Sequence, residues 1–275
     1  MIWLLALVFW QQQGPVIGVC TSLSNDSLLA ANHVLRLEES VSNTFNPRNV
    51  SEEKFQQILQ KIKTAKTQVL TANVFIPGSI KLVGPALNES IVIGYVDTVM
   101  KRASMAGLKI IVLGSGEARR IPAGFDSVRA SQQFIGIARK MADVAAKYNM
   151  LIAMENLNHT ETNMILSFRE AVKYAKAIDH PHFKLTADIY HMLMENEPAE
   201  HLLEGKGLLV NVHIAEKEER AYPGKRGTDF RPYFRAMKEI NYSGGIMIEC
   251  RWGNIDRELE LARSNLLSQL FGTIK

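Results

Sequence analysis

The chain has 275 residues, of which 47% are hydrophobic and 22% are charged. This composition excludes a disordered protein, a collagen-like protein and a membrane protein with several spans. The 32 basic and 28 acidic residues leave a formal net charge of +4, spread along the whole chain. Such a small and dispersed charge argues against a nucleic-acid partner. A single fold of this length buries enough apolar surface to be stable without disulfides.

The first ten residues are apolar almost without interruption, and three glutamines follow them. This run is shorter than the roughly 20 residues that a transmembrane helix needs, so no stable membrane span is expected. It is typical of the apolar region of an export signal, although no Lys or Arg precedes it. We therefore separate residues 1–13 from the fold, as an export signal or, alternatively, a disordered apolar tail. The first interpretation predicts a periplasmic or secreted protein, and the second a cytoplasmic one.

Downstream of this segment, short apolar segments of strand character alternate with longer segments of helical period. In chain order, the predicted strands are residues 16–20, 34–39, 68–75, 108–114, 151–157, 183–189, 208–215 and 245–250. The helices with the clearest pattern are residues 51–65, 88–106, 127–148, 163–178, 229–240 and 255–271. A helix is also expected after the first and after the sixth strand.

Eight strands, each followed by helical material, predict a single (β/α)8 TIM barrel over residues 14–275. Several of the strands are continuously apolar, as expected where both faces of a parallel sheet are covered. A doubly wound open sheet is the alternative, but it usually carries a glycine-rich turn after its first strand, and residues 21–25 contain no glycine. Closure of the barrel would place Cys20 and Cys250 on neighbouring strands, where we expect free thiols.

Four polar side chains lie where the last four predicted strands end, a position that packing alone would not favour. They are Glu155, Asp188, His213 and Glu249, and consecutive members are about one βα unit apart. The C-terminal ends of barrel strands form one rim, so these side chains are expected to converge. Three carboxylates and an imidazole would repel one another and raise their own pKa values unless a cation neutralised them. Oxygen-rich ligation with one nitrogen suits Mn²⁺, Mg²⁺ or Co²⁺, and Zn²⁺ is also compatible.

Further polar residues near this rim suit a pocket for a polyol. His191 lies just beyond the sixth strand and could donate a hydrogen bond to a sugar oxygen. Asn158 and Glu161 follow Glu155, and either could bind substrate or instead cap the next helix. Arg220 follows the seventh strand and could reach back over the metal site.

Two pairs of adjacent residues allow a more specific expectation. Glu38 and Glu39 end the second strand, and only one of them can face the barrel interior because side chains alternate along a strand. The loop after the fourth strand contains Gly-Ser-Gly followed by Arg119 and Arg120. Such a loop could form an anion-binding site from backbone N–H groups and one arginine.

The stretches around these residues resemble the xylose isomerase-like barrel superfamily, and most closely its sugar isomerase/epimerase branch. They are residues 112–120, 154–163, 187–192, 212–216 and 248–249, with the sequences VLGSGEARR, MENLNHTETN, ADIYHM, VHIAE and IE. The matching stretches run from strand four to strand eight. They are specific for the superfamily and much less so for the substrate.

The resemblance implies that the four residues at the strand ends hold one divalent metal ion. It also implies that Glu155 and Glu249 act as an acid/base pair on opposite faces of the sugar. Substrate would be bound by Glu161, His191 and Arg220. Arg220 lies seven residues after His213, whereas the epimerases of this branch have a spacing of six.

The implied enzyme is a metal-dependent sugar isomerase/epimerase that acts on a small sugar or keto-sugar. Proton removal next to a carbonyl that the metal polarises would give an enediolate, and reprotonation by the second glutamate an epimer or isomer. The alternative is a lyase/hydratase, in which the same enediolate expels a leaving group from a 3-keto-glycoside or keto-sugar. Export favours this alternative, because phosphorylated sugars are scarce outside the cytoplasm.

Two other classes of protein receive less support from the sequence. A non-catalytic sugar-binding barrel would be expected to lose one of the paired glutamates, and both are present. The apurinic-endonuclease branch builds a three-zinc cluster with additional histidines, and none stands at the predicted ends of strands three and four, near Asn73 and Gly114. A homo-oligomer is compatible with the sequence, which specifies neither the sugar nor the metal.

Overall fold

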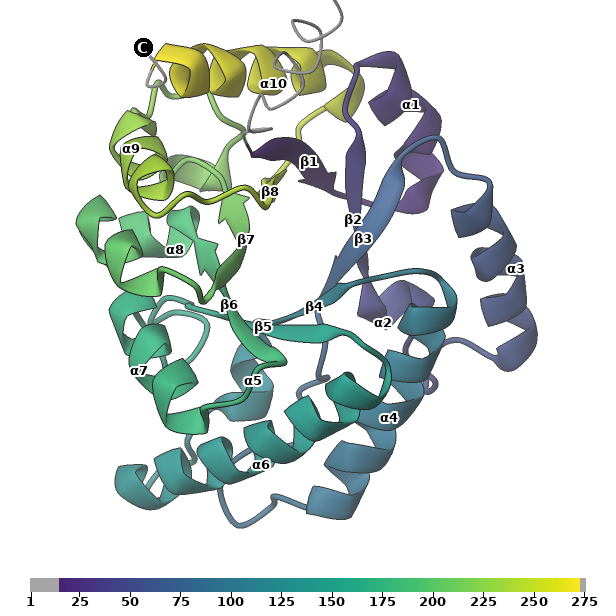
Figure 1. Ribbon diagram of the computed structural model, residues 1–275, viewed down its shortest axis with the longest axis vertical. Coiled ribbons are helices and arrows are strands. Elements are labelled where there is room, and N and C mark those ends of the chain that lie inside the picture. Colours follow the sequence, from purple (N-terminus) through teal and green to yellow (C-terminus); the bar gives the residue numbers. More distant parts are fainter. Residues whose placement is uncertain (1–14, 273–275) are drawn as a thin grey trace, which may run out of the picture.

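The computed structural model describes residues 15–272 and shows a closed barrel of parallel strands surrounded by helices (Figure 1). The strands follow one another around the barrel in chain order, and the first pairs with the last through Val16–Gly245 to Val19–Ile248. The predicted (β/α)8 barrel is therefore confirmed. The expected export signal, residues 1–13, lies outside the described residues.

All eight predicted strands are present, although most are shorter than predicted. They are β1 (Val16–Cys20), β2 (Arg36–Ser40), β3 (Gln68–Asn73), β4 (Ile110–Leu113), β5 (Leu151–Glu155), β6 (Phe183–Asp188), β7 (Leu209–Ile214) and β8 (Gly245–Ile248). The apolar runs extend past the strand ends because residues such as Phe75 and Leu157 are buried in the following loops. Apolar residues thus mark the buried part of each segment, which extends beyond the residues that pair as a strand.

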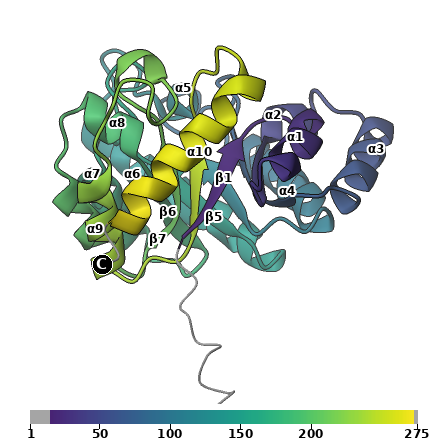
Figure 2. The same cartoon turned by 90° about the horizontal axis from the view of Figure 1, so that it is seen from above.

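The helices lie outside the strands. They are α1 (Asp26–Ala31), α2 (Val41–Thr44), α3 (Glu52–Lys63), α4 (Glu89–Met105), α5 (Gly116–Arg119), α6 (Ser127–Lys147), α7 (Phe168–Ile178), α8 (Ile189–Met194), α9 (Arg231–Glu239) and α10 (Ile255–Gly272), with 3-10 turns η1 (Leu23–Asn25), η2 (Ala199–Gly205) and η3 (Glu218–Arg220). In both views α10 lies beside β1, so the last helix covers the seam at which the barrel closes (Figure 2). No helix within residues 15–272 combines the length and the apolar character that a membrane crossing requires.

The long helices begin at side chains that cap their first backbone N–H groups. Asn88 accepts from the N–H of Ile91 at the start of α4, and Asp126 caps α6 in the same way. The prediction that α7 begins at residue 163 is wrong by five residues. Ser167 is its N-cap, whereas Asn163 accepts from the Ile121 N–H at 2.8 Å and donates to the Ile121 carbonyl at 3.0 Å. Asn163 therefore joins two loops instead of starting the helix.

Candidate metal centre

The four polar residues at the strand ends meet at one point of the rim. Glu155 ends β5, Asp188 ends β6, His213 lies in β7 beside Asp188, and Glu249 follows β8 directly. One ligand atom from each of these residues can be chosen so that all four lie within 4.8 Å of one another. The predicted convergence of three carboxylates and one imidazole is therefore present in the fold.

His213 is the centre of this cluster. Its Nδ1 lies 2.7 Å from Glu155 Oε1 and 3.3 Å from Glu249 Oε2. The His213 and Asp188 side chains are buried, whereas 24% of the Glu249 side chain is exposed. Solvent or a small ligand can therefore approach the cluster from the side of Glu249.

Burial of two of the carboxylates disfavours their charged forms. It raises the pKa of Glu155, and it raises the pKa of Asp188 to about 6. Neighbouring carboxylates, Glu249 among them, raise both pKa values further. A divalent cation would offset this repulsion, and three carboxylate oxygens with one imidazole nitrogen form a donor set that fits such an ion.

For the other two residues of the cluster, His213 and Glu249, neighbouring groups favour the charged form. Burial alone would lower the pKa of His213, but the carboxylates of Glu38 and Glu249 raise it well above its usual value. Burial also disfavours the Glu249 carboxylate, yet His213 and Arg220 together lower its pKa to about 2. The pKa values of Glu155 and Glu249 are therefore shifted in opposite directions, although both carboxylates lie against the same histidine.

Arg220 lies over the cluster, as predicted. Its Nη2 contacts the Glu249 carboxylate and lies 3.5 Å from Asp188 Oδ2, and its Nη1 lies 3.4 Å from Glu161 Oε1. The guanidinium also stacks 4.6 Å above the centre of the Tyr190 ring. Arg220 and the residue before it both have positive φ values, 50° and 60°, and this tight turn in η3 brings the side chain back over the rim.

His191 and Asn158 form a buried pair beside the cluster. Asn158 Oδ1 accepts hydrogen bonds from the backbone and hydroxyl of Thr160, so its Nδ2 faces His191 Nδ1 at 2.9 Å. The His191 ring is therefore protonated at Nε2, which lies 3.4 Å from Asp188 Oδ2 and 3.9 Å from Glu161 Oε2. Asn158 lies behind His191 and orients it, whereas His191 and Glu161 face the cluster.

Two residues of the site did not enter the prediction. Asn73, at the end of β3, donates through Nδ2 to Glu249 Oε1 at 2.8 Å. The buried Asn156 accepts from the Asp188 N–H at 3.0 Å and donates to the Asp188 carbonyl at 3.1 Å. Asn73 follows the same rule that identified Asp188, since it is a polar side chain at a strand end. Asn156 gives no comparable pattern, because its role depends on contact with the backbone at the end of the neighbouring strand β6.

The expected anion-binding loop after β4 is not formed. Arg119 is fully buried and donates to the carbonyl oxygens of Glu155 at 2.8 Å and Leu113 at 3.5 Å. Arg120 is engaged with the Glu117 carboxylate at 2.7 Å and the Glu161 carbonyl at 2.8 Å. Both arginines thus satisfy acceptors of the protein itself, and Arg119 joins the ends of β4 and β5.

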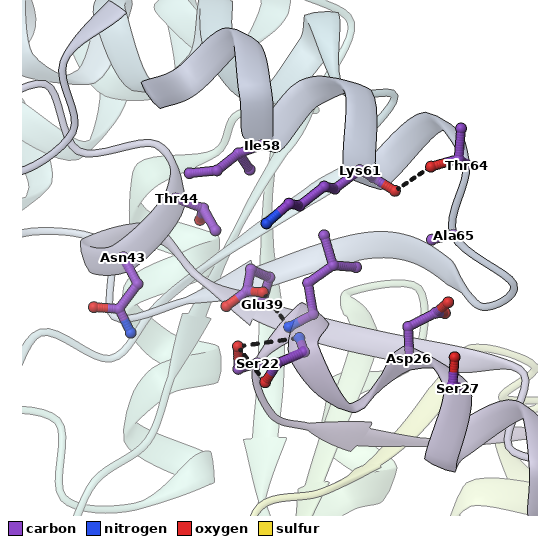
Figure 3. A pocket seen from close by; sticks show the side chains of 12 residues that line it. Ser22, Asp26, Ser27, Glu39, Asn43, Thr44, Ile58, Lys61, Thr64 and Ala65 are labelled. Carbon is purple, nitrogen blue, oxygen red and sulfur yellow. Dashed lines mark hydrogen bonds between the residues drawn. The ribbon is translucent and has the colours of Figure 1, made fainter. Parts of the chain in front are cut away.

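Glu38 and Glu39 point to opposite sides of β2, as predicted from strand alternation. Glu39 lines a pocket of about 420 Å³ between the surrounding helices, where Figure 3 shows it with Lys61 of α3. Its Oε2 accepts from the Leu23 N–H at 2.7 Å. Glu38 points into the barrel, where its Oε1 lies 2.8 Å from His213 Nε2.

Both cysteines have free thiols, as expected. Cys20 lies on β1, and its Sγ points into the barrel, 3.5 Å from Glu38 Oε1. Cys250 follows Glu249 and packs, half-buried, against the hydrophobic core. The barrel pairs β1 with β8, but the two thiols face different surroundings.

Three curated sugar epimerases match part of the chain. The L-ribulose 3-epimerase of Methylomonas sp. (strain DH-1) is 34% identical over 116 residues, which are 42% of this chain and 40% of that protein. The ketose 3-epimerase of Arthrobacter globiformis is 31% identical over 111 residues, 40% of this chain and 38% of its own. The 3-dehydro-D-guloside 4-epimerase of Escherichia coli (strain K12) is 32% identical over 114 residues, 41% and 43% of the two chains. The chain thus spans about two fifths of the length of these relatives.

Solved structures match over nearly the whole chain. A D-psicose 3-epimerase determined in the presence of D-fructose has a TM-score of 0.81 at 16% identity, covering 93% of this chain and 99% of its own. The apo 3-keto-D-glucoside 4-epimerase of E. coli has a TM-score of 0.76 at 20% identity. The match covers 92% of this chain and 99% of that chain. The IOLI protein, determined with a bound zinc atom, has a TM-score of 0.77 at 14% identity. The match covers 94% of this chain and 99% of that chain. The family model of the xylose isomerase-like TIM barrel matches residues 38–267, more than half of the chain, and the protein belongs to that family.

Proposed function

We propose that this protein is a divalent-metal-dependent sugar epimerase or isomerase whose acid/base pair is Glu155 and Glu249. The observation that carries the proposal is the convergence of these two carboxylates on Nδ1 of His213, at 2.7 Å and 3.3 Å. They come from β5 and β8, which are separated in the barrel by β6 and β7. Two carboxylates that reach one point from different strands can address a substrate carbon from two sides.

Glu155, Asp188, His213 and Glu249 are the residues that would hold the cation. A divalent cation bound there would supply a Lewis acid that polarises a substrate carbonyl. The structurally similar IOLI protein was determined with a bound zinc atom. The oxygen-rich donor set of this chain also accommodates Mn²⁺, Mg²⁺ or Co²⁺.

The proton transfers fall to the two glutamates. Glu249 is ionised, with its pKa near 2, and its partly exposed carboxylate would remove the proton from the carbon next to the carbonyl. Glu155, which reaches the same space from β5, would carry the proton that is returned to the other face of the enediolate. Return at the same carbon inverts its configuration and gives an epimer, and return at the neighbouring carbon gives an aldose–ketose isomer.

Three further side chains face the same space and suit substrate oxygens. His191 offers Nε2–H, Arg220 offers a guanidinium, and Glu161 offers a carboxylate acceptor with 41% of its side chain exposed. Asn158 would act through His191 by fixing its tautomer. This set of donors and acceptors matches the hydroxyl groups of a polyol.

The proposed substrate is a free ketose or a keto-glycoside. The names of the matched relatives support this class, because they specify ketose 3-epimerases and an epimerase of a 3-dehydro-glycoside. Both kinds of substrate carry a carbonyl next to a hydroxylated carbon, which is the chemistry that the two glutamates require.

The test is incubation of the protein with Mn²⁺ in D₂O and a panel of ketoses and 3-keto-glycosides. We expect deuterium at a carbon of altered configuration for at least one substrate, and no exchange in the Glu249→Gln variant. Loss of water or of an aglycone would instead identify the lyase/hydratase. Full exchange in Glu249→Gln, or none with any substrate of the panel, would contradict the proposal.

A further inference from the structure

A second buried carboxylate lies against the far side of the His213 ring. Glu38 Oε1 is 2.8 Å from His213 Nε2, and neither side chain is exposed. The other carboxylate oxygen, Oε2, accepts a hydrogen bond from Asn211 Nδ2 at 3.2 Å. Glu38 is therefore held from two sides in contact with the histidine.

A carboxylate only accepts hydrogen bonds, so the nitrogen that faces it must carry the proton. Nδ1 also faces a carboxylate, Glu155 Oε1 at 2.7 Å, so each ring nitrogen has a carboxylate partner. When a cation takes the place of the proton on Nδ1, Glu38 holds the remaining ring proton on Nε2. Nδ1 is the nitrogen that faces Glu155 and Glu249. The hydrogen bond with Glu38 thus makes the correct nitrogen available to the rim.

We propose that Glu38 is a positioning residue that fixes His213 in the Nε2–H tautomer, so that His213 binds the metal through Nδ1. The inference rests on the proposed metal centre. Histidine ligands usually donate their second ring N–H to a carboxylate or carbonyl, and removal of that partner typically costs about 10–100-fold in metal affinity. Asn211 supports the arrangement, because its hydrogen bond fixes the orientation of the Glu38 carboxylate.

A competing arrangement would use the other ring nitrogen. Cys20 Sγ lies 4.0 Å from His213 Nε2, and with Glu38 these residues form a second group that could hold a metal. That group offers one carboxylate, whereas the group at Nδ1 offers three. The group at Nδ1 also includes the partly exposed Glu249, which gives an incoming cation a route from solvent.

The experiment compares Zn²⁺ binding by the wild type, Glu38→Gln and Glu39→Gln. Glu39 is the matched control, because it is the adjacent buried glutamate and points away from His213. With a competing chelator, we expect Glu38→Gln to bind Zn²⁺ about 10–100-fold more weakly and Glu39→Gln to bind it like the wild type. In ¹⁵N NMR spectra of the Zn²⁺-loaded wild type, the His213 ring should show a protonated Nε2 and a metal-bound Nδ1.

Three outcomes would overturn the inference. Wild-type Zn²⁺ affinity in a folded Glu38→Gln variant would remove the role of Glu38. A metal-bound Nε2 in the wild-type spectrum, or weaker binding in Cys20→Ser, would assign the ion to the competing group. The wild-type spectrum decides the tautomer even if Glu38→Gln fails to fold. Absence of Zn²⁺ binding by the wild type would instead refute the proposed metal centre itself.

Discussion

At the scale of single residues, the proposed metal site is sensitive to protons because protons compete with a cation for its candidate ligands. Asp188 has a pKa of about 6, and the pKa values of Glu155 and His213 are also raised. All three must be deprotonated at the ligating atom to bind a cation. Below about pH 6 the proton on Asp188 therefore opposes binding, and the raised pKa of His213 extends this competition to higher pH.

We accordingly expect the affinity for Mn²⁺ to be lower at about pH 5 than at about pH 7.5, with protons released on binding. A chelator competition at the two pH values measures the affinity. Calorimetry in buffers of different ionisation enthalpy measures the number of protons released on binding. Equal affinity at both pH values, without proton release, would argue against ligation by these groups.

Gly114 makes room for one of the ligands. A Cβ built on this residue would overlap the Glu155 carboxylate, so Gly114→Ala should displace that side chain and weaken Mn²⁺ binding. Unchanged Mn²⁺ affinity in Gly114→Ala would show that Glu155 does not need its observed position.

Gly136, inside α6, has no atom near the position that a Cβ would take. Gly136→Ala should therefore raise the free energy of unfolding by about 0.5–1 kcal/mol.

At the scale of secondary structure elements, Arg119 of α5 connects the ends of β4 and β5. Its hydrogen bonds with the Leu113 and Glu155 carbonyls are buried, so Arg119→Met removes two buried hydrogen bonds. We expect the free energy of unfolding to fall by about 2–4 kcal/mol, measured by denaturant titration. Arg120→Met is the control, since this partly exposed neighbour should cost about 1 kcal/mol or less. Equal losses in the two variants would contradict the structural role of Arg119.

The order and type of the elements could be predicted because strand and helix periods differ along the chain. The four candidate metal ligands followed from a single rule, since acids and histidine have no packing reason to end apolar strands. Alternation restricted the inward side chain to one of Glu38 and Glu39, but did not say which. The role of Arg119 could not be predicted, because it depends on carbonyl groups that only the folded barrel brings within reach.

At the scale of the whole molecule, the site exists only when the barrel is closed. Its ligands come from β5 to β8, and Glu38 and Asn73 come from β2 and β3. A cation that binds this assembly and not the unfolded chain must stabilise the folded state. At a free cation concentration of 100 times the dissociation constant, the free energy of unfolding rises by about 2.7 kcal/mol.

We therefore expect Mn²⁺ to raise the Tm of the wild type, as measured by calorimetry. Asp188→Asn should abolish the shift while preserving the fold, because asparagine can still accept the hydrogen bond from the His191 N–H that caps α8. A Tm that rises equally in the variant would place the stabilising ion elsewhere.

One cation bound by the four residues at the rim is the central feature of the proposed function. Anomalous diffraction from a crystal loaded with Mn²⁺ measures this directly. We predict a single strong peak within ligand distance of Glu155, Asp188, Glu249 and Nδ1 of His213. A loaded crystal without a peak at this position, or with its peak on the Nε2 side of His213, would contradict it.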